Sequence, residues 1–413
     1  MANELFERLA AKSEKELLQN ILPFWSLQAV DHERDGFWAR VSADLGTRER
    51  SPQGVILNTR LLWTFSAVYR QFKNPSLLEL AHRAFRKITC AFTDPIYGGV
   101  YWMLDENDAP LDVSKKIYGQ AFAIYSLVEF FAASGDAEAL QRAQAIYRLI
   151  EKHNYDPTYT GYLESANRDW SAAQDLRLSD IDMNEKKSMN THLHLLEAYT
   201  QLYRVWPDEA LRVQLQKLIN NFLDHIINPQ TYHLILFFDE AWQPKSIKIS
   251  FGHDIETSWL LQEAAAALAE AETIQRCKIL CQAMAEAVLT QGVAADGGVC
   301  YEKDEKGTLD SEVHWWVQAE AVVGFINAYQ TSGRPDFLHA AIRAWDFIEK
   351  YLIDRTFGEW VYKVNEHRIP DTVLHKISEW KCPYHNSRMC LELMQRLSLT
   401  PVKSHDEGER NAA

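Results

Sequence analysis

The sequence predicts an all-α protein folded as an (α/α)6 barrel, a toroid of six helical hairpins with short β-hairpin pieces in the loops. Extended, aromatic-rich pieces, most of them with glycine, recur near positions 36, 99, 161, 235, 298 and 358. The repeat length is about sixty residues, with one longer interval, and a fixed internal period is the strongest fold signal in this chain. Apolar residues at helical spacing fill the intervals, and the chain ends fall in the first and last helices, as ring closure requires.

Each repeat unit therefore consists of a helix, an aromatic hairpin-like piece and a second helix. We expect helices at 4–28, 54–72, 76–92, 114–133, 137–153, 185–205, 208–227, 254–271, 273–290, 311–331, 335–352 and 378–396. The alternative is an open helical solenoid, but neither end carries a polar capping repeat. We expect one catalytic domain over residues 1–400, followed by a polar, disordered tail at 401–413.

Composition excludes several partners. The chain has 413 residues and a net charge of −14, without a long basic run, so nucleic acid and anionic membranes are poor partners. No stretch of about 18 uncharged apolar residues occurs, and the N-terminus lacks the order of a secretory signal. The six cysteines form no CxxC pair, which favours reduced thiols. We expect a cytoplasmic monomer that needs no cofactor and binds a small molecule, and the 13 Trp residues suit stacking on a sugar.

The stretch 250–260 contains the first candidate catalytic group. His253 and Glu256 lie three residues apart at the start of a predicted helix, so they share a face. A carboxylate beside an imidazole favours the charged ring and fixes its tautomer, which makes a tunable acid or base. The alternative is an ordinary helix start, in which acidic residues favour the positive end of the helix dipole.

Further polar residues occupy the same phase of the repeat. Arg60 interrupts an apolar run, and a buried Arg requires an anion or several acceptors, with an internal salt bridge as the alternative. Tyr118 takes the matching place in the next unit, and Asn190 and His194 are four residues apart on one helix face. His192 and His194 form an HxH, but on a helix the two side chains diverge, so we predict no metal site.

Two imidazoles facing each other across a funnel suit one reaction class. His385, in the predicted last helix, is the second candidate acid or base opposite His253. One base removes a proton from carbon beside a carbonyl, and the other returns a proton to the opposite face. Arg60 is placed to stabilise the enolate between these steps. The predicted outcome is epimerisation without a metal or nucleotide.

Four segments carry a family resemblance. They are Gly54–Trp63, Asn190–His194, Gly252–Glu256 and Trp380–Asn386. They resemble the signature segments of cellobiose 2-epimerases, a group within the N-acylglucosamine 2-epimerase superfamily, and the resemblance extends from about residue 10 to 397. It implies an (α/α)6 barrel that inverts C2 of a reducing-end sugar through a cis-enediolate.

The resemblance also implies roles for individual residues. His253 and His385 would be the acid/base pair, with His194 as a further catalytic group. Arg60, Tyr118 and Asn190 would bind or polarise the open-chain sugar, and Trp316 and Trp380 would stack on rings. Glu256 and Asp182 would orient the histidines.

Other functions stay open at this point. A mannose 2-epimerase, an N-acylglucosamine 2-epimerase or an aldose–ketose isomerase would share most of these residues. A glycoside hydrolase needs two carboxylates across a cleft, for which Glu256, Glu320 and Asp182 are available. The remaining alternative is a sugar-binding toroid without catalysis.

Overall fold

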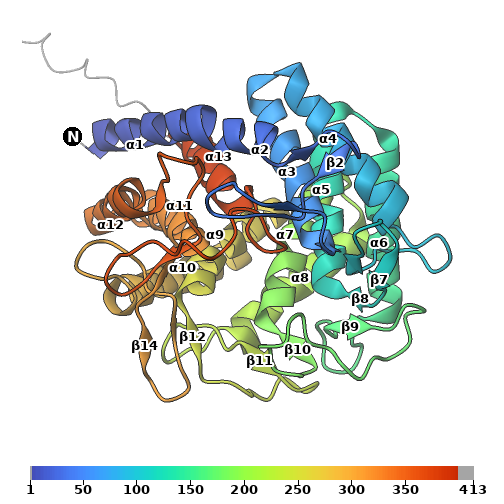
Figure 1. Ribbon diagram of the computed structural model, residues 1–413. Coiled ribbons are helices and arrows are strands. Elements are labelled where there is room, and N and C mark those ends of the chain that lie inside the picture. The colour runs from blue at the N-terminus through green and yellow to red at the C-terminus, as the bar shows by residue number, and fades with distance from the viewer. Residues whose placement is uncertain (1, 399–413) are drawn as a thin grey trace, which may run out of the picture.

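The computed structural model describes residues 2–398 and closes into the predicted (α/α)6 barrel (Figure 1). Six inner helices form the ring, in which each helix packs against the next and α13 packs against α3. They are α3 (Val55–Phe72), α5 (Ile117–Ser134), α7 (Met189–Val205), α9 (Phe251–Leu268), α11 (Trp315–Ser332) and α13 (Tyr384–Ser398).

The outer layer consists of the other helical segments, four of which end or continue in a π-helical turn. They are α1 (Ala2–Glu16), its turn Leu17–Ile21 and α2 (Leu22–Leu27); α4 (Pro75–Lys87) with Ile88–Phe92; α6 (Ala137–His153); α8 (Glu209–Asn221) with Phe222–Ile226; α10 (Ala271–Gln291); and α12 (Pro335–Phe347) with Ile348–Leu352. The helix α1 contacts both α12 and α13, so the N-terminal segment occupies the sixth outer position.

Burial separates the two layers as their sequences require. Every residue of α5 from Ile117 to Phe130 is buried, because an inner helix is covered by the ring on both sides and by an outer helix behind. The outer helix α4 instead buries a single stripe of four residues, Leu77, Ala81, Ala84 and Phe85. A helix with apolar residues on every face must be surrounded by other elements, whereas a helix with one apolar stripe needs to pack on one side only.

The two ends of the barrel differ. Inner helices pass to outer helices through short turns, such as Lys73–Asn74 and Gly135–Asp136, in which Lys73 and Gly135 take positive φ. Outer helices return to inner ones through long connections that carry the short strands. These strands are β1 (Val30–Asp31), β2 (Gly36–Phe37), β3 (Arg40–Val41), β4 (Arg48–Glu49), β5 (Gln53–Gly54), β6 (Met103–Leu104), β7 (Pro110–Asp112), β8 (Lys115–Lys116), β9 (Ser165–Ala166), β10 (Lys187–Ser188), β11 (Phe237–Phe238), β12 (Ile249–Ser250), β13 (Glu302–Lys303), β14 (Leu309–Asp310), β15 (Val313–His314) and β16 (Lys363–Val364).

The long connections are joined to one another around the mouth. The strand that precedes each of α3, α5, α7, α9 and α11 pairs antiparallel with the connection of the next unit, as β8 does with β9 and β10 with β11. An antiparallel bridge between Val41 and Ile377 completes the circle before α13. The mouth is therefore a closed frame of backbone hydrogen bonds.

These strands explain where the expected helix boundaries were wrong. The helices α5, α7, α11 and α13 begin three to six residues later than expected. The first three follow paired strands, and residues 378–383 before α13 form bends and irregular chain. Helix α9 begins earlier, at Phe251. The extended piece near 235, which lacks glycine, also forms a hairpin, with a bridge between Ile227 and Leu234. Tyr232 in its turn adopts a φ of 60°, in the positive range that glycine adopts in other hairpins.

No helix among residues 2–398 is long and apolar enough to cross a membrane. The six cysteines are free thiols, with Cys90 exposed and the others buried. The tail predicted at 401–413 lies outside the described residues.

Candidate active site

All ten side chains singled out in the sequence line a single cavity at the mouth of the barrel, with a volume of about 360 Å³. This volume is in the range of small-molecule sites. The ten residues are Arg60, Tyr118, Asp182, Asn190, His194, His253, Glu256, Trp316, Trp380 and His385.

The inner helices place these side chains by a common rule. Tyr118, Asn190, Trp316 and His385 are each the second residue of their helix. Arg60, His194 and Glu256 are the sixth, one turn further along the same face, and His253 is the third residue of α9. Similar positions in successive repeats therefore converge on the barrel axis, which is why the polar residues recur at one phase of the sequence.

The fourth residue of these helices has a structural task instead. The Gln120 side chain accepts the backbone N–H of Val100 at 2.9 Å and donates to its carbonyl at 2.8 Å. In the next repeat His192 Nε2 accepts the N–H of Tyr162 at 2.9 Å, while Nδ1 lies 2.7 Å from the Ser188 carbonyl. Both ring nitrogens of His192 are thus engaged by backbone groups, and the two histidines of the HxH diverge.

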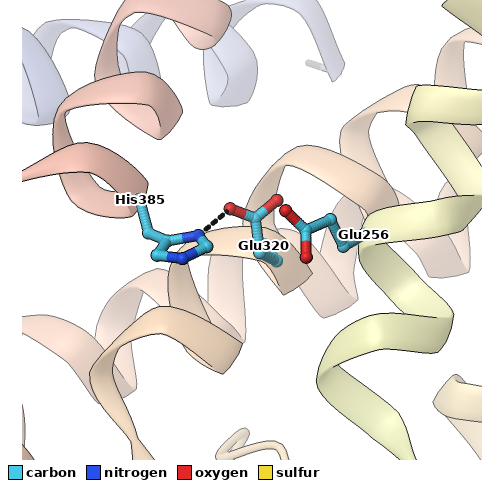
Figure 2. Close-up of side chains that lie close together, drawn as sticks. All are labelled: Glu256, Glu320 and His385. Atoms are coloured by element: carbon cyan, nitrogen blue, oxygen red, sulfur yellow. Dashed lines mark hydrogen bonds and ion pairs between the residues drawn. The ribbon is translucent and has the colours of Figure 1, made fainter. Parts of the chain in front are cut away.

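His385 rests on a buried carboxylate. Its Nδ1 lies 2.7 Å from Glu320 Oε1, and Glu320 also accepts a hydrogen bond from Trp259 Nε1 at 3.1 Å. Figure 2 shows the contact between His385 and Glu320. Burial, together with the positive charges of Arg60 and Arg388, lowers the pKa of His385 well below its usual value. A neutral His385 that donates from Nδ1 to Glu320 has Nε2 available as a base.

His253 lies on α9, two positions along the ring from α13, and has a different partner. Its Nδ1 is 2.7 Å from Ser250 Oγ, and burial, reinforced by the positive charge of Arg60, lowers its pKa to about 3. The Trp316 ring contacts both imidazoles, with ring centroids 4.9 Å from His253 and 5.5 Å from His385. Both histidines are therefore neutral near pH 7 and border the same aromatic ring.

His194 is the third imidazole of the cavity. Its Nδ1 lies 3.0 Å from Glu197 Oε2, and its ring meets the Tyr118 ring edge-on at 4.9 Å between centroids. Burial alone would raise the pKa of Glu197, but Arg388 and the hydrogen bond from His194 outweigh it and bring that pKa to about 2. Glu197 is a charged carboxylate that holds His194.

The partners implied for the histidines were wrong. Glu256 is hydrogen-bonded to Arg388 and not to His253, because its carboxylate lies one turn deeper while His253 Nδ1 turns back to Ser250. Asp182 accepts from the backbone N–H and hydroxyl of Ser179 at 2.9 and 2.7 Å, within its own loop. Trp380, expected inside the last helix, lies in the loop before α13.

Arg60 is available to an anionic oxygen. It is 3% exposed, donates from Nη2 to the Tyr118 hydroxyl at 3.0 Å and faces the Phe122 ring at 4.4 Å. Within residues 2–398 no carboxylate lies within ion-pair distance of it, so the internal salt bridge is not found there. Asn190 Oδ1 is buried without a hydrogen-bond partner in the described part of the chain, and it faces the same cavity.

A group of potential metal ligands includes two residues that line the cavity, Glu256 and His385. Oxygen and nitrogen atoms of Glu256, Glu320 and His385 all lie within 4.8 Å of one another. Figure 2 shows these three side chains close together. Arg388 donates to Glu256 Oε1, and to Glu320 Oε1 at 2.7 Å. A guanidinium therefore already supplies the positive charge that these two carboxylates require.

Three residues of this site were not assigned to it from the sequence, Ser250, Glu197 and Arg388, and Glu320 was considered there only as a carboxylate for the hydrolase alternative. Glu197 follows His194 by three residues, the same spacing that drew attention to His253 and Glu256. Arg388 interrupts an apolar helix as Arg60 does. Both signals were present, but only the closed ring identifies which carboxylate each group meets.

Comparison with known proteins agrees with the geometry. The family model for N-acylglucosamine 2-epimerase matches residues 36–387. A cellobiose 2-epimerase of Bacteroides fragilis is 44% identical and aligns over 94% of this chain and 99% of its own length. The structure of the cellobiose 2-epimerase of Bacillus thermoamylovorans B4167 matches with a TM-score of 0.90 and 38% identity, covering 94% of this chain and all of that one. A D-mannose isomerase of Marinomonas mediterranea is 22% identical, aligning over 92% of this chain and 96% of its own length. This chain therefore belongs to the N-acylglucosamine 2-epimerase family.

Proposed function

We propose that this protein inverts C2 of the reducing-end glucose unit of cellobiose and so forms glucosyl-mannose. The observation that carries the proposal is the pair of neutral imidazoles, His253 and His385, beside one tryptophan ring in a sugar-sized cavity. Each has Nδ1 engaged by a partner, which leaves Nε2 for proton transfer. The 44% identical cellobiose 2-epimerase supports this substrate.

The chemistry needs only proton transfers. Ring opening exposes the C1 carbonyl, for which His194 is the available acid or base. One of His253 and His385 then takes the C2 proton, the C2–H electron pair moves into a cis-enediolate, and the Arg60 guanidinium stabilises its negative charge. The negative charge of the enediolate lets the other imidazole take up a proton from solvent, which it returns to the opposite face of C2, and the first imidazolium then loses its proton to solvent. The net change is the configuration at C2.

Incubation with cellobiose, lactose, glucose and mannose in D2O, followed by product separation and NMR, tests this proposal. We expect the disaccharides to gain their C2 epimers, with deuterium at C2 of the product, because each histidine exchanges its proton with solvent. Conversion of the monosaccharides alone would assign the protein to the mannose-type alternative. Absence of any C2 epimer, or retention of the original proton at C2 throughout, would overturn the two-histidine account.

Product analysis and calorimetry distinguish two further functions, those of a hydrolase and of a sugar-binding toroid. A hydrolase would release glucose from cellobiose, which requires two carboxylates on either side of the glycosidic bond. Glu320 instead lies behind His385 and is joined to Glu256 by Arg388. A sugar-binding toroid would give tight binding in calorimetry without turnover.

A further inference from the structure

Arg388 lies beneath the active site without lining the cavity. It is the fifth residue of α13, is 1% exposed, and its guanidinium packs on the rings of Tyr384 at 4.4 Å and Trp259 at 4.8 Å. The proposed reaction assigns it no step. Burying a guanidinium carries a large desolvation cost, which its hydrogen-bonded partners must offset.

Its hydrogen bonds connect two of the three cavity histidines. Nη2 donates to Glu320 Oε1 at 2.7 Å, and the same oxygen lies 2.7 Å from His385 Nδ1. Nη1 donates to Glu197 Oε1, whose other oxygen lies 3.0 Å from His194 Nδ1. The guanidinium thus stands between the two carboxylates that hold the histidines, and it also donates to Glu256.

We propose that Arg388 is a positioning residue that sets the tautomers of His194 and His385 together, by keeping Glu197 and Glu320 charged so that each accepts from an imidazole Nδ1–H. This inference rests on the proposed epimerase function. A charged carboxylate only accepts hydrogen bonds, so the imidazole proton stays on Nδ1 and Nε2 stays a base. A protonated carboxyl group could donate to Nδ1 instead, which would move the imidazole proton to Nε2 and remove the base.

The charges of the cluster support this role. One guanidinium faces three buried carboxylates, those of Glu197, Glu256 and Glu320. Burial and the neighbouring charge of Glu320 raise the pKa of Glu256 to about 7. Burial also raises the pKa of Glu320, although Arg388 and Trp259 oppose the shift. Near neutral pH the Glu256–Glu320 pair therefore carries a proton for part of the time, and Arg388 determines how far Glu320 stays charged.

Other titratable groups face this cluster from the surrounding helices. They are Arg60, Tyr118, Tyr125, His194, Tyr384 and Glu392. Removing Arg388 deprives three carboxylates of their common cation, so the carboxyl pKa values rise. The acidic limb of kcat against pH then moves to higher pH.

The variant Arg388→Met tests this, because it keeps much of the side-chain volume and removes the charge. We expect kcat to fall by roughly 100-fold or more, as for a histidine held in the wrong tautomer. KM should change little because Arg388 does not touch the cavity, and the acidic limb should move upward.

Arg388→Lys should give a smaller shift in the same direction, since one ammonium cannot replace the planar fork that reaches both carboxylates. In the double variant Arg388→Met with Glu256→Gln, one of the mutually repelling carboxylates is gone. The acidic limb of kcat should then move partly back to lower pH.

A matched control removes a buried cation elsewhere. Lys115 forms an ion pair with Asp94 at 3.0 Å, both side chains fully buried, and Asp94 touches no cavity histidine. Lys115→Met should lower the melting temperature without moving the acidic limb.

A readout independent of turnover is 15N NMR of histidine-labelled protein. We expect His385 and His194 as Nδ1–H tautomers in the wild type and a gain of Nε2–H in Arg388→Met. An unchanged pH limb and unchanged tautomers, with kcat lost, would reduce Arg388 to a structural role and overturn the proposal. A wild-type protein that forms no C2 epimer would instead refute the proposed function, while the tautomers would still test Arg388.

Discussion

His385 and His253 border the same tryptophan ring but rest on different partners. Behind His385 lies a carboxylate, Glu320, that is itself hydrogen-bonded to Trp259 and Arg388. Behind His253 lies a single hydroxyl, that of Ser250, from the strand before α9. A carboxylate both fixes a tautomer and stabilises an imidazolium, whereas a hydroxyl contributes only a hydrogen bond.

His385 and His253 should therefore differ in strength as acids toward the two faces of the sugar. Both imidazoles are neutral near pH 7. When a negative enediolate forms beside them, each gains affinity for a proton, and His385 gains it with a carboxylate already in contact. We therefore expect the His385 side to depend on its partner more strongly than the His253 side.

The largest effect should come from removing either histidine. His253→Ala and His385→Ala should each lower the epimerisation rate by about 1,000-fold, since each loses the proton transfer on one face. The product assay with cellobiose measures this. Deuterium exchange at C2, started separately from cellobiose and from its epimer, shows which face the remaining histidine serves. A double variant that epimerised near the wild-type rate would contradict the two-base mechanism.

Replacing the partners tests the comparison itself. Glu320→Gln should lower kcat by about 100-fold, because an amide cannot stabilise the imidazolium and can present either a donor or an acceptor to Nδ1. Ser250→Ala should lower it less than tenfold, since only a neutral hydrogen bond is lost. Equal losses in the two variants, measured with the same substrate and pH, would show that the partners act alike.

Gly252 controls the ring that both histidines contact. A Cβ at this position would overlap the Trp316 ring and approach Val317, so Trp316 would have to move. Gly252→Ala should lower kcat/KM by about tenfold through displacement of Trp316. Gly135→Ala is the matched control, because a Cβ there meets nothing within 4 Å and only the positive φ of 75° is strained. It should destabilise the fold slightly and leave kcat/KM unchanged.

The pH dependence should be the mildest test. Burial lowers the pKa of His253 to about 3 and that of His385 well below its usual value, so both bases stay proton-free as pH falls through 6. We expect kcat/KM to persist near pH 5. Stability should decline over the same range, because the unfolded histidines bind protons below about 6.5 while the folded ones do not. Rates from pH 4 to 8, with circular dichroism at each pH, separate the two effects. A fall in kcat/KM near pH 6.5, the ordinary pKa of an imidazole, while the protein is still folded would contradict the lowered pKa values of the two histidines.

Local sequence features determined the repeat and the positions of its functional residues. Helical periodicity and hairpin chemistry act over a few residues, so the helical segments and the phase of Arg60, Tyr118, His194 and His253 were predictable. Boundaries failed where extended residues before a helix pair with the next loop, as Lys115–Lys116 do with Ser165–Ala166. That pairing depends on a segment about fifty residues away and leaves no local pattern.

Only the tertiary structure decided which groups meet across the ring. His385 and Glu320 are 65 residues apart in the chain, and Arg388 and Glu197 are 191 apart. From the sequence, Glu256 shares a helix face with His253 and was assigned to it. In the barrel the Glu256 carboxylate lies one turn further along α9 than His253, where Arg388 from the closing helix is within reach. Hydrogen-bond partners of buried groups follow from helix packing around the axis, and that packing exists only once α13 has closed against α3.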